Sequence, residues 1–539
     1  MRFQLYELTT KLNIVMKRIF LVLLLLAAFA VHAQTIEVSG IQTGVWSADT
    51  VFVMGNVTVQ DSLRIVPGTT VIFDDFYGIT VEKGASMLAI GTEADSILFT
   101  VTDTTGFHIF NAGRGGWNGI RLEKAGPSQF KYCRFQFGKA ALDVDQDGGA
   151  LRIFNCDEVE IGNSTLFCNF SREHGGALSA ENSKVVMHDC DVLNNLTYTK
   201  LDTVYGMYGG GLRFLKCEVD ITGSNFRYNV GESAIGGALS LDSCATKIDR
   251  CKFEHNYGIN GGGLYVMRSN HLGRDVITNS LFANNTSGHF GGGLAVCEAS
   301  PWISNLTVVN NHSIGVNCGG IFFYQYSEPI LWNCIVYGNT NEIPLDEPVQ
   351  IWSWTYDESG PQFYGCLVQY GLENISNNEV VTVYEGCLDE DPLFVAPENE
   401  DFHLTANSPC IDAGYTMAPD MGYDLDGNWR VCGDRIDIGA YEYSGAGVQE
   451  NAQKESFIHI VGNPITASSF AEIELQEAGN VVTSIYSIEG RMLNKKHWGR
   501  LQEGASRIVI GEMFEGLAGG PYLLVIKAGN QTAASKVIK

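Results

Sequence analysis

Proline and basic residues are scarce in this 539-residue chain, and long apolar runs are nearly absent. It has 13 prolines against 61 glycines, and 35 Lys and Arg against 61 Asp and Glu, so its formal net charge is −26. A glycine excess without a collagen period indicates many tight turns. Residues 1–33 carry +3 and residues 457–539 carry +1, so the acidity lies between them. We therefore expect no nucleic-acid partner; the acidic surface attracts cations and keeps an extended protein soluble.

The one long apolar run lies near the N-terminus. Lys17 and Arg18 precede an apolar stretch over 19–31, and the small Ala33 follows. Basic residues, a short apolar run and small residues in this order predict a secretory signal peptide over 1–33. The apolar run is too short to cross a membrane as a helix, and no later segment is longer. We expect export, with no transmembrane anchor after the signal is removed.

Two motifs recur at intervals of 25–34 residues through the middle of the chain. The first is a tetrad of two glycines, a small residue and an aliphatic residue. It ends at Leu151, Leu178, Leu212, Leu239, Leu264, Leu294 and, as a variant, Ile321. The second is an apolar residue followed three places later by Asn. It ends at Asn169, Asn195, Asn229, Asn256, Asn285, Asn311 and Asn339. Two motifs in step over seven turns indicate a repeat architecture.

The residues around both motifs alternate with a period of two, which predicts strands with one buried face. The outward positions after the early tetrads are polar, and we expect them to be wet: Arg152, Ser179, Arg213 and Ser240. A second column, of mostly small residues, is expected to face inward: Cys133, Ser164, Cys190, Ser224, Cys251, Ser280, Leu306, Cys334 and Cys366. Coils in register stack at about 4.8 Å, so the Asn amides can bond as a ladder. The fold class is therefore all-β, a right-handed parallel β-helix over residues 34–443.

Short motifs add resemblances to known families. Gly176-Ala-Leu and Phe226-Arg-Tyr-Asn resemble the repeats of chlamydial polymorphic outer-membrane proteins, which are β-helical adhesins. Trp117-Asn-Gly-Ile, with Asp391-Pro-Leu-Phe and Asp437-Ile-Gly-Ala-Tyr, resembles the opening and closing segments of Bacteroidota surface β-helix proteins. The second resemblance implies a closing segment over 388–443 and a place at the cell surface.

A different domain is predicted after a solvated linker at 444–456. Residues 457–539 contain short strands, together with Asn463-Pro464, Gly490-Arg491 and a terminal Lys536-Val-Ile-Lys. They resemble the type A sorting domain of the type IX secretion pathway, which implies a small β-sandwich. The same resemblance implies two partners, the outer-membrane translocon and a sorting peptidase. A domain that merely caps the rod is the alternative.

Fourteen cysteines in an exported chain would ordinarily indicate disulfides. Cys133, Cys190 and Cys251 instead lie two coils apart, about 9.6 Å, so we interpret them as small buried residues. Neighbouring pairs remain possible disulfides: Cys334 with Cys366, Cys217 with Cys244, and Cys410 with Cys432. No Cys-x-x-Cys pair is present, so no structural zinc site is expected.

Asp143, Asp145 and Asp147 are spaced as in a calcium loop, with Gly148 as the turn. Calcium is thus the one cofactor that we consider, and a solvated acidic turn is the alternative. Asp424-Leu-Asp426-Gly-Asn428 offers a weaker version.

No catalytic column is found, so no catalytic residue is predicted. The outward positions after the apolar residue of each Asn motif carry no line of carboxylates: Gln136, Phe167, Leu193, Arg227, Glu254, Ala283, Val309 and Tyr337. Glu173-His174 and Glu254-His255 fall in turns. The aromatic residues Tyr205, Tyr208, Tyr324, Tyr326, Trp352 and Trp354 offer a sugar platform or simple packing.

Two functions remain open. The first is a secreted or surface adhesin or glycan-binding protein without catalysis. The second is a polysaccharide lyase or glycoside hydrolase, because the β-helix architecture hosts such enzymes. Three or more carboxylates converging in a groove would favour the enzyme.

Overall fold

A computed structural model describes most of the chain after the predicted signal peptide. The described residues are 34–107, 113–142, 144–198, 207–269, 275–315, 318–342, 349–355, 360–415, 422–430, 433, 435–443, 458–461, 465–466, 469–475, 478–487, 492–517, 521–528 and 531–539. The predicted signal peptide (1–33) and linker (444–456) lie outside them.

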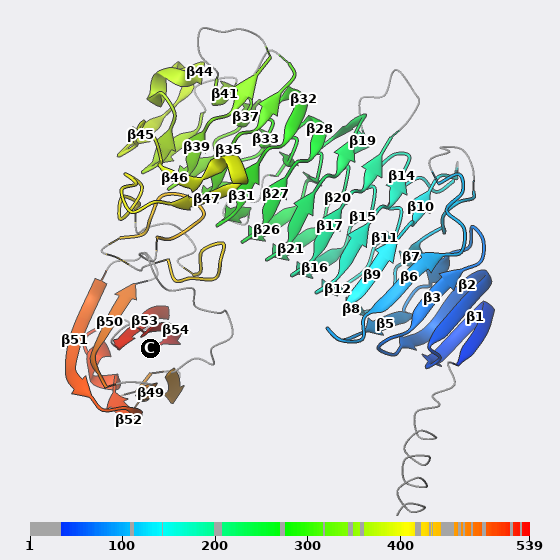
Figure 1. The fold of residues 1–539 in the computed structure, drawn as a ribbon, viewed down its shortest axis with the longest axis horizontal. Helices are drawn as coiled ribbons and strands as arrows, with labels where there is room; N and C mark the ends of the chain where they lie inside the picture. Colours follow the sequence, from blue (N-terminus) through cyan, green and yellow to red (C-terminus); the bar gives the residue numbers. More distant parts are fainter. Residues whose placement is uncertain are drawn as a thin grey trace, which may run out of the picture.

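Successive coils of chain wind around one interior, and each coil contributes strands to three parallel faces (Figure 1). The first coils come from β1 (Thr35–Trp46) and the long β2 (Thr50–Ile65). The face that begins after each tetrad contains β4 (Ile79–Val81), β7 (Ile120–Glu123), β11 (Leu151–Phe154), β15 (Leu178–Glu181), β20 (Leu212–Leu215), β25 (Leu239–Asp242), β29 (Leu264–Met267), β33 (Leu294–Cys297), β37 (Ile321–Tyr324), β41 (Ile351–Trp354) and β44 (Ile375–Ser376). We call it the tetrad face.

The second face follows a tight turn in each coil. It contains β5 (Ser86–Ile90), β8 (Ser128–Lys131), β12 (Val159–Gly162), β16 (Lys184–His188), β21 (Glu218–Thr222), β26 (Ala245–Asp249), β30 (Val276–Thr278), β34 (Trp302–Ser304), β38 (Ile330–Trp332), β42 (Gln362–Tyr364) and β45 (Val383–Glu385).

The third face precedes each motif asparagine. It contains β3 (Thr70–Phe73), β6 (Ile97–Val101), β9 (Cys133–Gln136), β13 (Thr165–Phe167), β17 (Asp191–Leu193), β22 (Asn225–Arg227), β27 (Lys252–Glu254), β31 (Leu281–Ala283), β35 (Thr307–Val309), β39 (Ile335–Tyr337) and β43 (Leu367–Val368). Short strands after the asparagines pair in an eight-stranded sheet: β10 (Lys139–Ala140), β14 (Phe170–Ser171), β18 (Leu196–Thr197), β23 (Val230–Gly231), β28 (Tyr257–Asn260), β32 (Thr286–Phe290), β36 (His312–Ser313) and β40 (Thr340–Asn341).

The predicted register is confirmed. Leu239 pairs with Leu264, and Phe226 with Phe253, in parallel ladders. Equivalent side chains therefore stack, and the Phe226 and Phe253 rings lie 4.6 Å apart and nearly parallel. The inward residues of all three faces form one continuous buried core. Each coil buries its apolar face only against its neighbours, as in other solenoids.

The glycines of the tetrad have a steric cause. Gly261 has φ +61°, and a Cβ there would lie 2.3 Å from the carbonyl oxygen of Leu264. A Cβ on Gly262 would lie 2.4 Å from the carbonyl oxygen of Gly292 in the next coil. The first glycine thus permits the left-handed turn and the second permits the close approach of coils.

The expectation that the outward positions of the tetrad face are wet is wrong for three of its four residues. Ser179, Arg213 and Ser240 are buried, and only Arg152 is partly exposed. The chain just before each tetrad folds over this face, and its residues pair from coil to coil, as in β19 (Met207–Tyr208) with β24 (Ala234–Ile235). The side chains alternate with a period of two, as predicted, but a second layer of chain covers the outward side of this face.

The closing segment packs along the third face instead of extending the rod. Here β46 (Phe394–Ala396) and β47 (Asp401–Leu404) pair antiparallel, and their apolar residues pack on a cluster that includes Ala283, Val309 and Leu367. Three short 3-10 helices occur in this region: η1 (Gly371–Asn374), η2 (Asn378–Val380) and η3 (Pro397–Asn399).

The C-terminal strands form two antiparallel sheets over a separate core, a small β-sandwich. One sheet contains β48 (Ile458–Val461), β49 (Phe470–Leu475) and β52 (Gly504–Val509); the other contains β50 (Gly479–Ser487), β51 (Met492–Leu501), β53 (Pro521–Ala528) and β54 (Gln531–Ile538), with η4 (Gly511–Phe514) between strands. Within the described ranges, no helix has the length and apolar character needed to span a membrane.

Candidate functional site

The acidic turn before β11 is divided between two environments. The Asp145 carboxylate accepts from Arg121 Nε at 2.6 Å, and Arg121 also donates to the carbonyl of Gly148 at 2.9 Å. The Oδ1 of Asp147, by contrast, is buried and has no hydrogen-bond partner among the described residues. Asp143 lies outside the described residues. The predicted calcium loop therefore shows one carboxylate held by arginine and one without such a partner.

The structure brings Asp147 together with Glu173 and His174, which belong to the next coil. Asp147 pairs with His174 in a parallel bridge, and His174 pairs with Tyr208 in the same way. One nitrogen or oxygen ligand atom from each of Asp147, Glu173 and His174 lies within 4.8 Å of the others. Glu173 and His174 lie in a turn, and their sequence alone predicted no role for them beyond that of polar turn residues.

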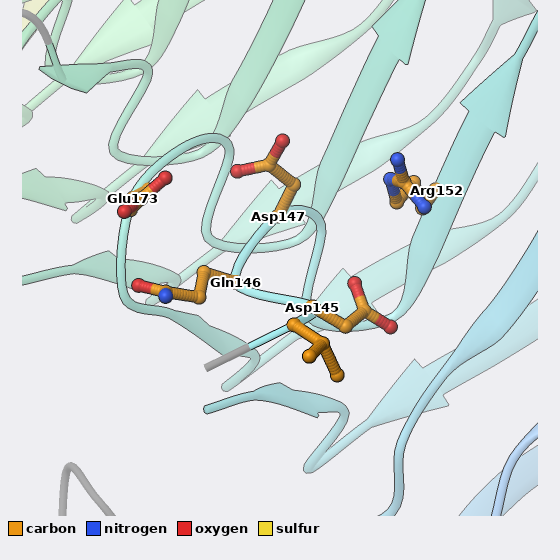
Figure 2. Close-up of a pocket in the computed structure, with 6 residues that line it drawn as sticks. Asp145, Gln146, Asp147, Arg152 and Glu173 are labelled. Carbon is orange, nitrogen blue, oxygen red and sulfur yellow. The ribbon is translucent and has the colours of Figure 1, made fainter. Parts of the chain in front are cut away.

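An open cavity of about 230 Å³ accompanies this group. Its lining residues are Val144, Asp145, Gln146, Asp147, Arg152 and Glu173. Figure 2 shows the carboxylates of Asp147 and Glu173 at the cavity and Arg152 on the neighbouring strand. Nearly all of the groups that line it are hydrogen-bond donors or acceptors, so it suits a polar ligand.

Burial controls the protonation of this group. Burial raises the pKa of Asp147, and the charges of Arg213 and Arg152 only partly offset this rise. The pKa of His174 is lowered to about 4, first by burial and then by Arg213. His174 is thus neutral at pH 7. Its Nδ1 accepts from the Tyr208 N–H at 3.2 Å, so the neutral ring carries its proton on Nε2.

This tautomer bears on whether the group holds a metal ion. A histidine that ligates a metal through one nitrogen nearly always donates a hydrogen bond from the other. In His174 the second nitrogen is an acceptor, so a transition-metal ion would have to displace the Nε2 proton or the Tyr208 contact. Calcium prefers oxygen ligands, and only Asp147, Glu173 and their neighbours offer them. The geometry fits hydrogen-bond recognition better than a metal centre.

The other predicted candidates are occupied by structural contacts. Asp424 accepts hydrogen bonds from the backbone N–H groups of Asp426 and Asn428, so its carboxylate stabilises the turn in which it lies. His255 contacts Glu400 of the closing segment, and Glu254 pairs with Arg227 at 3.3 Å.

The candidate aromatic platform is partly used for packing. Tyr324 stacks on Phe322 and meets Trp354 edge to face. Trp354 is 44% exposed and Tyr326 is 60% exposed, so these two rings keep area for a ligand. Tyr205 lies outside the described residues.

A signal for the missed group was present in the sequence. The residue just before each tetrad is Asp147, His174, Tyr208, Ile235, Asn260 or Phe290. Because the tetrads are in register, residues in this position must stack, so Asp147 and His174 had to be neighbours.

In-register coils around one interior, with a polar cavity on their outer turns, define a right-handed parallel β-helix protein. Residues 202–385 match the family model described as a right handed beta helix region. Among solved structures, a similar one is the tailspike protein gp49 from Acinetobacter baumannii bacteriophage Fri1, a capsular polysaccharide depolymerase. The two are 8% identical, the match covers 94% of this chain and 80% of that chain, and the TM-score is 0.17. A likeness at this TM-score says nothing about function. No curated protein matches the sequence.

Proposed function

We propose that this chain is an exported β-helix protein of the cell surface that binds polysaccharide without cleaving it. The observation that carries the proposal is the Asp147, Glu173 and His174 group. At the cavity the two carboxylates accept from neighbouring sugar hydroxyls, and the Arg152 guanidinium, which lines it with them, donates. Asp147 and Glu173 both line the cavity, so a sugar hydroxyl there can donate to the part of either carboxylate that the cavity exposes.

The outer layer of the tetrad face extends this surface. Charged residues at its N-terminal coils give way to aromatic ones at its C-terminal coils, where Trp354 and Tyr326 remain exposed. Sugars bind to exposed aromatic faces through their apolar C–H surfaces and to carboxylates through their hydroxyls. A polysaccharide chain lying along the rod would meet both.

The proposal includes the route of export. Removal of the signal peptide at 1–33 leaves Gln34 first, and the C-terminal domain at 457–539 directs the chain to the type IX translocon and its sorting peptidase. The motifs of the C-terminal residues support this part, together with the two small antiparallel sheets. Adhesion to a host surface is the role that such delivery serves.

A second candidate, polysaccharide cleavage, is favoured by one observation. Three carboxylates, those of Asp145, Asp147 and Glu173, line one cavity, and burial raises the pKa of Asp147. Glycoside hydrolases use a pair of carboxyl groups, one of them with a raised pKa: that group protonates the leaving oxygen, and the other activates water or attacks the sugar.

One experiment separates these functions. The purified chain is titrated with neutral and acidic polysaccharides, with and without Ca²⁺, and both heat of binding and new reducing ends or ultraviolet absorbance are measured. We expect saturable binding without turnover. Asp147→Asn and Glu173→Gln should each weaken it about 10–100-fold, the effect of losing one charged hydrogen bond.

Glu218→Gln, an exposed acid on the second face, is the matched control and should bind normally. Turnover that Asp147→Asn abolishes would establish the second candidate. Binding that none of the pocket variants changes would reject this site.

A further inference from the structure

The inward column of the third face contains cysteines in two different settings. In the early coils Cys and Ser alternate, and the Cys133 N–H donates to Ser164 Oγ at 3.0 Å. At the C-terminal end of the rod the alternation stops, and Cys334, Cys366 and Cys387 follow in three successive coils. These thiols are stacked on one another, with no serine between them.

Backbone pairing places Cys366 and Cys387 in register. The residues that follow them, Leu367 and Leu388, form a parallel bridge. The Leu388 N–H donates to the Cys366 carbonyl at 2.8 Å. In-register neighbours lie about 4.8 Å apart, within the Cα separation of about 4.4–6.8 Å that a disulfide requires. The two thiols are in hydrogen-bonding contact, and Cys366 also accepts from the Cys334 N–H at 3.5 Å.

Access and mobility distinguish Cys387 from the other stacked thiols. Cys334, Cys366, Cys217 and Cys244 are buried, whereas Cys387 is only partly buried. Its coil is the last one, with η1, η2 and the short β44 and β45. Among the described strands, β45 pairs with β42 and has no further neighbour in the ladder. A coil that has a ladder neighbour on one side only can adjust as the two sulfurs approach bonding distance.

We propose that Cys366 and Cys387 form a disulfide that fastens the last coil to the rod when the protein meets an oxidising disulfide. The Cys387 thiolate attacks a sulfur of a small-molecule or protein disulfide and releases one thiol. The Cys366 thiolate then attacks the Cys387 sulfur of the mixed disulfide and releases the second thiol. Both cysteines are oxidised and the external disulfide is reduced to two thiols, so atoms and electrons balance.

Conditions for the reaction follow from the surroundings. The pKa of the Cys387 thiol is raised, first by its contact with Cys366 and then by burial. Exchange needs the thiolate, so the bond should form faster as the pH rises. Formation in the cell rests on the proposed export, because disulfides persist in oxidising compartments. The chemistry itself is independent of that proposal.

The test uses the full chain, purified reduced and then incubated with oxidised glutathione at mildly alkaline pH. Unreduced peptide mapping should show the Cys366 peptide linked to the Cys387 peptide. Cys387→Ser should abolish this link and Cys334→Ser should leave it. The oxidised protein should unfold at a midpoint a few degrees higher than the reduced one, because the link shortens the free loop of the unfolded chain.

Differential alkylation keeps the result interpretable where a variant folds poorly. Cys387 in the native wild-type protein should lose its reactivity toward a thiol reagent after oxidation. A link between Cys334 and Cys366, a link confined to Cys217 and Cys244, or a Cys387 that stays alkylatable would each overturn the proposal. Failure of export in cells, with the link formed in vitro, would count against the proposed function only.

Discussion

The asparagine of each coil is the residue whose role the structure explains most completely. Asn256 is buried, and its Oδ1 accepts from both the backbone N–H and the Nδ2 of Asn229, each at 3.0 Å. Its own Nδ2 donates to the Phe226 carbonyl and to Asn285 Oδ1. The predicted ladder is confirmed: it runs from Asn169 to Asn339, and Gln350 and then Asn374 continue it into the last coils. Each side-chain amide therefore forms hydrogen bonds with groups of the coil before it and of the coil after it.

Replacing one member of this ladder should therefore be costly. Asn256→Ala leaves the Asn229 backbone N–H and side-chain amide without their acceptor and frees the Phe226 carbonyl. Each unsatisfied buried group costs about 1–3 kcal/mol, so we expect a loss of about 3 kcal/mol or more. Urea unfolding monitored by circular dichroism measures it. Lys247→Ala, at an exposed position of the same coil, is the control, and equal midpoints for the two variants would contradict the ladder's importance.

At the scale of elements, the two motifs were enough to predict the strands, their register and the core. The glycine tetrad and the asparagine are each required by local backbone geometry. Because that geometry recurs in every coil, these residues recur at regular intervals in the sequence. The second layer over the tetrad face was missed because period two reports which side chains alternate, not what lies beyond them. A trace existed: along the rod the residue before the tetrad changes from Asp147 to Phe290, and Phe290 stacks on Phe322, the outward residue of the next coil.

The sequence motifs predicted a closing segment, but they did not predict that it packs against the side of the rod. Its contacts join residues more than a hundred positions apart, as between Arg227 and Glu400 at 3.1 Å. Such a contact does not recur from coil to coil, so the repeat pattern cannot predict it. The apolar Ala283 and Val309, on a column that is polar at Arg227 and Glu254, are the one indication that later coils are covered on this face.

The closing segment should also respond to pH. His403 contacts Asp426 at 2.6 Å and Asp401 at 2.5 Å. The hydrogen bond that His403 donates to the Asp426 carboxylate is the main cause that raises the pKa of His403 to about 9. Because the folded pKa exceeds the unfolded value of 6.5, the stabilisation is complete below about pH 6.5 and is lost as the pH rises through about 9. His403 is partly exposed, so we expect a modest effect.

The measurement compares urea midpoints of wild type and His403→Gln at about pH 6 and about pH 10. Wild type should be the more stable at the lower pH, and the difference should vanish at the higher. His289→Gln, the same substitution on β32, controls for the change itself. A difference that persists at the higher pH would mean that packing against Tyr441, and not charge, is what His403 contributes.

For the whole molecule, coils that are equivalent and contact only their neighbours should be removable one at a time. Leu151 pairs with Ile120 on one side and Leu178 on the other, in the same register. Deleting residues 151–177 joins Ala150 to Leu178, so that β15 takes the place of β11 against β7. The stability of a solenoid is close to a sum of units and interfaces, so the shortened chain should still fold cooperatively.

This deletion also removes Glu173 and His174, so it tests site and architecture together. We expect native-like circular dichroism and protease resistance, with polysaccharide binding abolished. Deleting 151–163 removes β11 and β12 but leaves β13, so two faces of the rod lose a strand while the third keeps its own; the ladders cannot all stay in register, and this control should not fold. If the full-coil deletion also fails to fold, the coils are not interchangeable units. If it folds and still binds, the ligand lies elsewhere on the rod, and the exposed Trp354 and Tyr326 become the site to test.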